Sequence, residues 1–525
     1  MRTTTTILAL AAAILPTVTE GLVLQQKQPE QQGQDGRPAP KVVGMPIERR
    51  RPTRDPVHRD KLRKRGTLAA ALDNEETLYF INATIGTPGK SVRLHIDTGS
   101  SDLWVNTPSS QLCAESSQPC KYAGTYMANS SSTYEYIGSW FNISYVDGSG
   151  ASGDYVSDTI TIGGRSGTSN NGGVKLERLQ FGIGYSSTNS QGILGIGYPI
   201  NEVQVGRAGM KPYKNLPAQM VADGVIESSA YSLWLNDLDA DTGEILFGGV
   251  DQEKYTGSLQ TLPIQSSGSG IFAEFLITLT SLRLGDTVIK PASSSSSSDS
   301  VDNNNDNLAL AVLLDTGSSL TYLPDAMVSQ IYTLVNAQYD SSAGAAYVPC
   351  SLATSTPQQL EFTFSGPTIK VDMNELVLDL VTSSGNRPTF QNGVPACLFG
   401  IAPAGSGTNV LGDTFLRSAY VVYDMDNNQI SLAQTKFNTT ASRVVEIGKG
   451  EGAVPDATMV ANPVVATEGI SGGGGGGGGG SANGGGGGLF GGLGGLDSAA
   501  SGIRMMGDSL AVSMVMGVVV FLSLF

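Results

Sequence analysis

One five-residue motif, Asp-Thr-Gly-Ser-Ser, occurs twice in this chain, at residues 97–101 and 315–319. Each copy follows an apolar run typical of a strand, 92–96 before the first and 308–314 before the second. A motif repeated in this way predicts two related lobes that each contribute one aspartate to a shared site. Two carboxylates held close together cannot both ionise easily, so one stays protonated. Such a pair can act as base and acid on one water molecule.

The alternation of apolar runs and turns around these motifs predicts an all-β protein. From about residue 77 to 438, short runs rich in Val, Ile, Tyr, Phe and Thr alternate with turns of Gly, Ser, Asn and Asp. The clearest expected strands are 77–85, 139–145, 158–162, 243–247, 272–282 and 420–423. Helical patterns occur around 216–223 and 324–337. The 525 residues are too many for one compact core and suit two lobes, placed at 66–262 and 263–440, with processed ends.

These motifs resemble the pepsin-like (family A1) aspartic proteases, and in particular the fungal, glycosylphosphatidylinositol (GPI)-anchored yapsin-like group. The similarity covers about residues 77–438, with catalytic motifs at 96–105 and 314–321. Each motif has a later apolar-apolar-Gly partner, at 193–195 and 410–412, which in the family crosses beneath the catalytic loop. The resemblance implies a bilobal fold with an active-site cleft between the lobes. It also implies an endopeptidase that cleaves polypeptides and needs no cofactor and no metal.

The catalytic residues would be Asp97 and Asp315. One carboxylate takes a proton from the attacking water while the other donates to the developing oxyanion. Threonines can hydrogen-bond beneath the pair, and glycines let the backbone approach the carboxylates closely. By resemblance, serines satisfy the outer carboxylate oxygens. The supporting residues are therefore Thr98, Gly99, Ser100, Thr316, Gly317 and Ser318.

Residues 143–149 resemble the flap of this family, a β-hairpin that closes over the substrate. Tyr145 would be its aromatic residue, Trp104 the hydrogen-bond partner of that tyrosine, and Asp147 and Gly148 its tip. Closure would exclude water and align the scissile bond. The alternative is that an aromatic residue on a strand only fills the core.

The cysteine and sequon content fits a secreted protein. An even, sparse set of four cysteines favours two disulfides over a zinc site. Three pairings are possible, and we predict the local one, which joins Cys113 to Cys120 and Cys350 to Cys397. Four N-glycosylation sequons agree with this compartment. Their asparagines are Asn82, Asn129, Asn142 and Asn438.

The N-terminal region predicts a signal peptide and a propeptide. Residues 1–20 contain an apolar run at 7–15 that is too short to span a bilayer, as in a secretory signal. Residues 21–65 are rich in Gln, Pro and Arg, show little apolar periodicity and end in a basic cluster. We expect a Kex2-like processing protease to cleave after Lys64-Arg65. The cationic propeptide would cover an anionic cleft until acidification weakens the ion pairs.

The predicted propeptide and the rest of the chain carry opposite net charges. Residues 22–65 hold 12 Lys/Arg against 5 Asp/Glu, whereas residues 66–525 hold 19 against 41. Nucleic-acid binding by residues 66–525 is therefore not expected. We also expect the protein to be a monomer. Two histidines, His58 and His95, leave too few ligands for a zinc site. We expect His95 to be a strand residue on the opposite face from the neighbours of Asp97.

The C-terminal region predicts a membrane anchor. Glycine tracts at 472–480 and 484–488 indicate a flexible tether, placed at 441–496. Small residues, a short spacer and an apolar tail follow in the order of a GPI-attachment signal, 497–525, whose tail is removed. A transmembrane helix is the alternative, but the 16-residue tail is short for one. The attachment residue is expected among Asp497, Ser498, Ala499, Ala500 and Ser501.

Together these features predict a secreted zymogen tethered to the outer face of the cell membrane or to the cell wall. The yapsin-like resemblance implies some preference for basic residues near the scissile bond. A Ser/Asp/Asn stretch, 293–307, is expected to be a disordered surface loop, with proteolytic nicking there left open. Two other readings remain: a catalytically silent, wall-anchored binding protein on the same scaffold, and a general digestive pepsin, which would end near Asn438.

Overall fold

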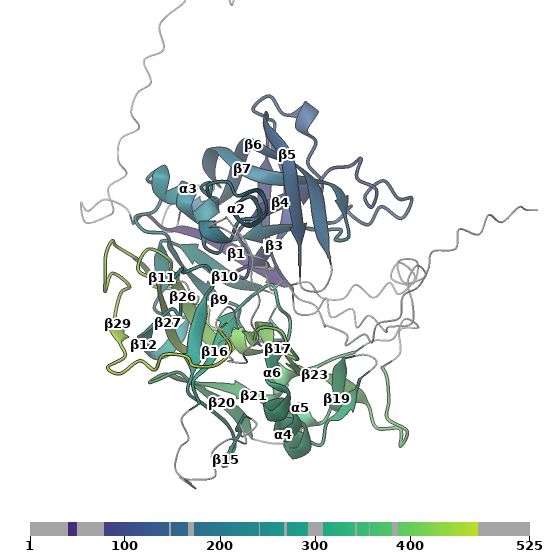
Figure 1. The fold of residues 1–525 in the computed structure, drawn as a ribbon, viewed down its shortest axis with the longest axis vertical. Coiled ribbons are helices and arrows are strands. Elements are labelled where there is room, and N and C mark those ends of the chain that lie inside the picture. Colours follow the sequence, from purple (N-terminus) through teal and green to yellow (C-terminus); the bar gives the residue numbers. More distant parts are fainter. Residues whose placement is uncertain are drawn as a thin grey trace, which may run out of the picture. The chain divides into compact units, whose positions relative to one another are not determined.

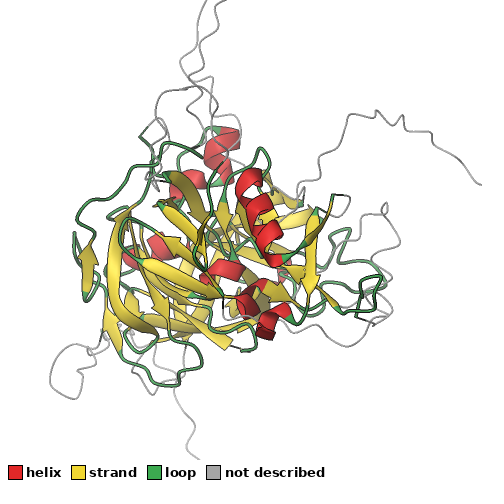
Figure 2. Ribbon diagram, turned by 90° about the horizontal axis from the view of Figure 1, so that it is seen from below, coloured by secondary structure: helices red, strands yellow, loops and turns green. Residues whose placement is uncertain are grey.

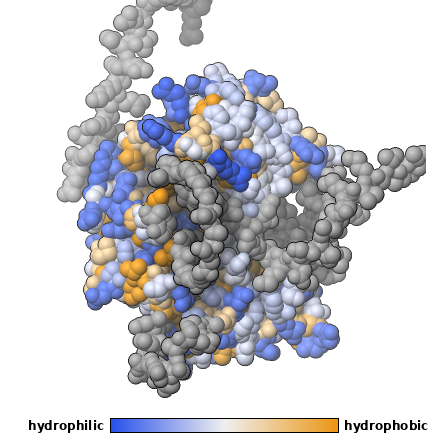
Figure 3. All heavy atoms as spheres, in the orientation of Figure 1, coloured by the Kyte–Doolittle hydropathy of each residue, from blue (hydrophilic) through white to orange (hydrophobic). Residues whose placement is uncertain are grey.

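The computed structural model describes residues 40–49, 78–145, 149–165, 173–240, 242–266, 270–291, 308–341, 344–355, 358–380 and 387–470. They fall within one compact unit, Pro40–Phe525. Strands dominate and the helices are short (Figure 2), which confirms the expected mostly-β fold. None of the helices described is long and apolar enough to cross a membrane. The face drawn in Figure 3 mixes hydrophilic and hydrophobic residues in small patches.

Within the described residues, fourteen strands form one sheet that joins the two halves of the chain (Figure 1). In spatial order they are β29 (Ala457–Met459), β12 (Tyr255–Pro263), β27 (Gln429–Thr435), β26 (Ala419–Asp424), β9 (Ala230–Trp234), β10 (Thr242–Phe247), β1 (Val43–Arg49), β2 (Tyr79–Ile85), β3 (Lys90–Asp97), β8 (Gly192–Gly195), β4 (Leu103–Asn106), β7 (Gly173–Ser187), β6 (Gly150–Arg165) and β5 (Glu135–Ser144). In β3, Leu94 and Ile96 enter the main core, so strand alternation turns His95 and Asp97 to the other face.

The second half of the chain builds further sheets. A five-stranded sheet contains β13 (Leu276–Leu279), β16 (Leu310–Leu314), β25 (Val410–Leu411), β17 (Thr321–Leu323) and β24 (Ile401–Pro403). One four-stranded sheet contains β15 (Thr287–Val288), β14 (Ser281–Leu284), β20 (Gln359–Thr363) and β21 (Thr368–Asp372). Another contains β18 (Gln338–Asp340), β19 (Ala345–Pro349), β23 (Ala396–Phe399) and β22 (Val377–Leu378). The strand expected over 272–282 is therefore two strands, β13 and β14, which belong to different sheets.

The described helices are α2 (Val203–Ala208), α3 (Leu216–Ala222), α4 (Asp325–Val335), α5 (Leu352–Ser355), α6 (Met373–Leu376), α7 (Asp413–Leu416) and the 3-10 turns η2 (Ala128–Ser130) and η3 (Pro199–Asn201). The two segments with helical patterns are α3 and α4, as predicted. In α4, Met327, Val328, Ile331 and Val335 are buried, the spacing of one apolar helix face. The helix ends where Asn336 adopts a left-handed conformation, with φ of 54°.

Part of the predicted propeptide lies inside the main sheet. β1 pairs antiparallel with β10, Val43 opposite Phe247, and its far end pairs with β2. Val43, Met45 and Ile47 are buried, so this segment contributes to the core. This strand is hard to predict from sequence, because the alternation lasts only seven residues and includes Pro46. Proline lacks the N–H that a central strand needs, and normally argues against one.

The predicted tether also begins with ordered structure. After β27 the chain forms β28 (Val444–Glu446), which pairs with β11 (Gly249–Asp251). It then forms β29, which pairs parallel with β12. Ile447, Val454 and Val460 are buried along this path. The expectation of a flexible tether starting at residue 441 is thus corrected, because residues 444–470 pack against the rest of the protein through scattered apolar side chains. We call residues 444–470 the C-terminal strap.

Two disulfides join Cys113 to Cys120 and Cys350 to Cys397, which confirms the predicted pairing. All four sequon asparagines are exposed. Several predicted features lie outside the described residues: the signal 1–20, the cleavage site at Lys64 and Arg65, the flap-tip residues Asp147 and Gly148, the loop 293–307, the tether beyond residue 470 and the anchor signal 497–525.

Candidate active site

The two repeated motifs meet in the structure. Asp97 is the last residue of β3, and Asp315 directly follows β16. Both side chains are completely buried, and their carboxyl groups lie close together. A Cβ placed on Gly317 would lie 2.5 Å from Oδ1 of Asp97 and 3.0 Å from Oδ1 of Asp315. Only glycine therefore leaves room for the two carboxyls to share this space.

Each aspartate is held by its own loop in the same way. The backbone N–H of Gly99 donates to Oδ1 of Asp97, and that of Gly317 donates to Oδ1 of Asp315, both at 2.8 Å. The hydroxyl of Ser318 donates to Oδ2 of Asp315 at 2.7 Å, and Ser100 makes the equivalent bond to Asp97. The sequence predicted these residues as supports, and the structure brings all of them to the carboxyls.

The threonines lock the two loops together. Thr98 Oγ1 donates to the carbonyl of Leu314 at 2.9 Å, and Thr316 Oγ1 donates to the carbonyl of Ile96 at 2.9 Å. The backbone N–H groups of the two threonines donate to each other's hydroxyl oxygen at 3.1 and 3.0 Å. These four buried bonds fix the position of one aspartate relative to the other.

Burial raises the pKa of both aspartates, and the hydrogen bonds from Ser100 and Gly99 offset part of this effect at Asp97. At Asp315 the pKa is raised well above its usual value, first by burial and then by the negative charge of Asp97. Because the two groups titrate together, the proton belongs to the pair rather than to either residue. A pair that shares one proton in this way can supply both the base and the acid that act on one water molecule.

The predicted apolar-apolar-Gly segments lie directly beside the strands that lead to the two aspartates. β8 runs parallel to β3 with Gly195 beside Asp97, and β25 runs parallel to β16 with Leu411 beside Leu314. A Cβ on Gly195 would meet the backbone nitrogens of residues 101 and 102 at 2.6 Å. A Cβ on Gly412 would meet the carbonyl oxygen of residue 318 at 2.2 Å. Both glycines are required by this close packing.

The expected flap corresponds to the hairpin of β5 and β6. The N–H of Tyr145 donates to the carbonyl of Ser149 at 2.8 Å and closes the turn. Trp104 Nε1 donates to the Tyr145 hydroxyl at 2.7 Å, which is the predicted contact. Tyr145 also packs in a cluster of buried side chains with Phe141 and Ile193, so it is a core residue of the hairpin as well.

Comparison with known proteins agrees with this geometry. The family model described as eukaryotic aspartyl protease matches residues 78–435. The chain belongs to this family.

The protease is similar to probable aspartic-type endopeptidases of fungi. It is 54% identical over 432 residues to opsB of Aspergillus oryzae, covering 82% of this chain and 83% of the relative. It is 47% identical over 465 residues to OPSB of Trichophyton verrucosum, covering 88% of each. The crystal structure of the aspartic proteinase from Irpex lacteus shares the fold, with a TM-score of 0.55, 20% identity and coverage of 77% of this chain and 100% of that one. This chain is accordingly a hydrolase, an aspartic-type endopeptidase.

A buried acidic residue behind the flap of the protease was missed from the sequence. Asp102 Oδ1 accepts from the hydroxyls of Tyr155 at 2.6 Å and Tyr213 at 3.0 Å, and Oδ2 accepts from the N–H of Val203 at 2.8 Å. Tyr155 belongs to the same cluster as Tyr145. Asp102 thus braces the flap hairpin and the start of α2. Its only signal in the sequence is its place directly after the first motif.

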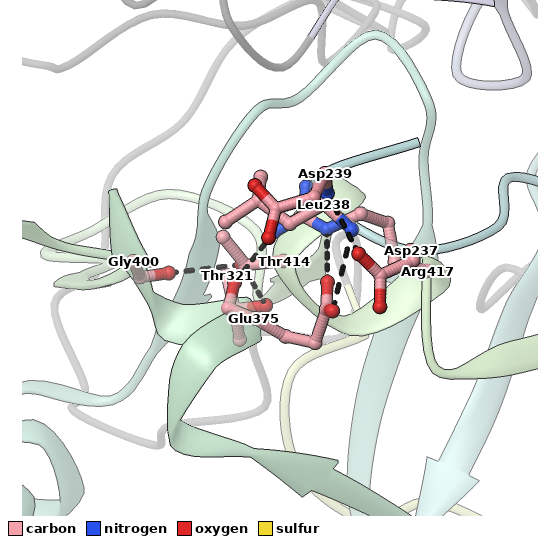
Figure 4. A network of polar contacts seen from close by, with 8 residues as sticks. All are labelled: Asp237, Leu238, Asp239, Thr321, Glu375, Gly400, Thr414 and Arg417. Atoms are coloured by element: carbon pink, nitrogen blue, oxygen red, sulfur yellow. Dashed lines mark hydrogen bonds and ion pairs between the residues drawn. The ribbon is translucent and has the colours of Figure 1, made fainter. Parts of the chain in front are cut away.

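A second network of buried polar contacts was also missed from the sequence (Figure 4). Arg417 and Glu375 form a fully buried ion pair, and Glu375 also accepts from the backbone N–H of Leu238 at 3.3 Å. Nearby, Thr414 Oγ1 donates to the carbonyl of Gly400 at 2.9 Å and lies 3.0 Å from the hydroxyl of Thr321. The network connects a loop of the first half to β17. Its members lie far apart in sequence, so no local pattern shows it.

One group of metal-binding residue types occurs among the described residues, formed by Cys350, Asp379 and Cys397. The two cysteines are joined by a disulfide, so their sulfurs do not provide thiolate ligands. Asp379 instead pairs with Arg387 at 2.7 Å. This group therefore does not fit a metal site.

Proposed function

We propose that the protease is made as a secreted zymogen of the yapsin-like group. It acts on polypeptides as a monomer, without a cofactor, at the outer face of the cell membrane or in the cell wall, held there by a GPI anchor. Asp97 and Asp315 are its catalytic residues. The observation that carries this proposal is that the two buried carboxyls lie close together, each supported by the same glycine and serine contacts.

In the proposed reaction the charged member of the pair takes a proton from a water molecule. The water oxygen adds to the peptide carbonyl, while the protonated member donates its proton to the carbonyl oxygen. The tetrahedral intermediate then collapses, the C–N bond breaks, and a proton passes to the leaving amine. The pair returns to one proton and one charge. Tyr145 on the flap covers the bound peptide and excludes bulk water, supported by Trp104.

Charge supports a preference for basic substrates. Residues 66–525 carry 41 acidic against 19 basic side chains, a field that attracts cationic peptides. The same balance supports an inhibitory role for the cationic segment 22–65. Processing after Arg65 alone leaves β1 hydrogen-bonded between β10 and β2. Maturation therefore includes either the retention of this strand or its departure from the sheet, and N-terminal sequencing of the mature enzyme distinguishes the two.

The decisive experiment incubates the acid-activated enzyme with a mixed peptide library at acidic pH, beside an Asp97→Asn variant, and maps the cut sites by mass spectrometry. We expect cleavage by the wild type, concentrated next to Lys and Arg, and none by the variant. Cleavage without a basic preference rejects the yapsin-like specificity alone. No cleavage after verified propeptide removal favours the silent scaffold instead.

Anchoring and processing are tested in cells. We expect a phosphatidylinositol-specific phospholipase to release the protease from membranes, and replacement of residues 497–501 by bulky charged residues to prevent attachment. We expect Arg65→Ala, with Lys64→Ala, to leave the propeptide uncut. Retention on membranes after phospholipase treatment, with an intact C-terminal tail, favours a transmembrane helix.

A further inference from the structure

A short exposed segment beside the flap hairpin carries three cations. Arg207 lies in the last turn of α2, and Lys211 and Lys214 follow it. All three side chains are exposed, as are the other residues from 206 to 212. Residues 203–222 contain no Asp or Glu. We call residues 207–214 the cationic loop.

A cluster of this kind is unusual on this acidic protein, in which residues 66–525 hold 41 Asp/Glu against 19 Lys/Arg. Several other cations face a carboxylate; Lys370, for example, lies 2.9 Å from Glu361. Within the part of the chain that the structure describes, the three cations of the loop have no ion pair and no side-chain hydrogen bond. Asp102 and Glu202, which lie beneath the loop, are buried. The loop therefore presents a local positive charge to solvent.

Hydrogen bonds hold this segment against the catalytic loop of the first motif. Just before the cationic loop, the backbone N–H of Val203 donates to Oδ2 of Asp102 at 2.8 Å. Near the end of the cationic loop, the Tyr213 hydroxyl donates to Oδ1 of the same carboxyl at 3.0 Å. Asp102 directly follows the motif at 97–101. Both ends of the loop are therefore tied to the segment that carries Asp97.

The same segment contacts the flap hairpin. The ring of Tyr213 lies 5.8 Å from that of Tyr155 on β6, edge to face. Val203 and Tyr213 pack against the buried cluster that contains Tyr145. α2 also lies against β5, the other strand of the hairpin (Figure 1). The cationic loop thus lies where the flap hairpin meets the catalytic loop, beside the place proposed for the substrate.

We propose that the cationic loop binds acidic side chains of the polypeptide substrate, on one side of the scissile bond. An extended peptide advances about 3.3 Å per residue, so a loop beside the flap reaches side chains a few positions from the bond that is cut. Opposite charges on loop and peptide favour association and fix which way the peptide lies. This inference deepens the proposed function, on which it rests, by adding an acidic feature to the preferred substrates.

The test measures kcat and KM on peptides built on one cleavage site found in the library experiment. Glu replaces Gln at one position at a time, on both sides of the scissile bond. At pH 5.5, where Glu is ionised, we expect Glu at neighbouring positions on one side to lower KM about two- to fivefold, with little change in kcat. We expect this advantage to disappear at pH 3, where Glu is protonated, and in high salt.

Variants then assign the effect to the loop. Each protein is scored by its ratio of kcat/KM for a Glu peptide to that for the matched Gln peptide, so partial unfolding of a variant cancels. We expect Lys211→Gln combined with Lys214→Gln to bring this ratio to about one, because both ion pairs are lost. The control is Lys90→Gln combined with Lys121→Gln, which removes the same charge at two exposed lysines and should keep the ratio. Lys90 begins β3, at the opposite end of that strand from Asp97.

Three outcomes overturn the inference and leave the proposed function intact. One is equal kcat/KM for the Glu and Gln peptides at every position. Another is the same advantage at all positions, which indicates a general effect of charge. The third is an equal loss of the ratio in the control variant. A wild type that cleaves nothing in the library rejects the proposed function itself, so the two failures are distinct.

Discussion

Thr98 and Thr316 hold each other by reciprocal hydrogen bonds: each backbone N–H donates to the other hydroxyl, at 3.1 and 3.0 Å. Each hydroxyl in turn donates to the carbonyl of the residue before the other aspartate, at 2.9 Å in both cases. Neither loop can shift without breaking bonds in the other. The spacing of the carboxyls is therefore a property of the pair of loops.

Replacing Thr98 by Val tests this coupling. The variant keeps the shape of the side chain but removes one donor and one acceptor, and it leaves the buried N–H of Thr316 without a partner. We expect unfolding to become easier by about 1–3 kcal/mol, and kcat to fall more than tenfold because the pair loses its spacing. Thr98→Ser, which retains the hydroxyl, is the control. Equal activity of the Val and Ser variants would contradict the coupling.

The bond from Trp104 to Tyr145 predicts a specific effect on the flap. Trp104→Phe removes the N–H that donates to the Tyr145 hydroxyl at 2.7 Å. We expect kcat/KM to fall about tenfold, since Tyr145 loses the bond that orients it over the substrate. Trp140→Phe is a matched control on the same hairpin, because the indole N–H of Trp140 is buried without a hydrogen-bond partner. Similar losses in both variants would indicate general disturbance of the hairpin.

Glu202 predicts how stability depends on pH. It is 1% exposed, and burial, followed by the charge of Asp102, raises its pKa to about 10 from the ordinary value of 4.5. A carboxyl with a raised folded pKa stabilises the protein fully below pH 4.5, and this contribution is lost as the pH rises from 4.5 towards 10. The loss is at most about 1.4 kcal/mol per pH unit.

The measurement is urea unfolding of Glu202→Gln in an Asp97→Asn background at pH 5 and pH 7. Because Gln stays neutral, we expect the variant to lose about 2–3 kcal/mol less than its parent between the two pH values. Glu177→Gln, at a side chain that is 71% exposed, serves as the control and should follow the parent. Parallel curves for all three proteins would show that Glu202 is not buried as a neutral acid.

The C-terminal strap predicts where the protease can be shortened. It buries Ile447, Val454 and Val460, and its Glu468 carbonyl accepts from the N–H of Ala311 on β16 at 2.8 Å. We expect a chain ending at Ile470 to fold and cleave peptides like the full chain. A chain ending at Thr440 should lose about 5 kcal/mol of stability or more, because three buried aliphatic side chains and a contact to the strand before Asp315 are removed.

Thermal melting and peptide cleavage of the two shortened proteins provide the comparison. Equal stability of both would mean that the strap is only a tether. A chain ending at Thr440 that is stable but has reduced kcat would show that the strap acts mainly through β16.

The sequence determined the chemistry of this protein. Asp97 and Asp315 lie in identical short motifs, each following an apolar run, and residue type alone indicates a carboxyl pair with threonine, glycine and serine supports. Local patterns also identified the helices α3 and α4, most strands and the two disulfides. These features depend on residues that are close in sequence or on repeats that are easily seen.

Tertiary structure decided which distant residues meet. The ion pair of Arg417 and Glu375 and the tyrosines around Asp102 join segments without any shared local pattern. β1 and the C-terminal strap are ordered only because neighbouring strands offer them hydrogen bonds and apolar surface. Short segments of this kind have too little apolar periodicity of their own, so their conformation is set by long-range contacts rather than by local sequence.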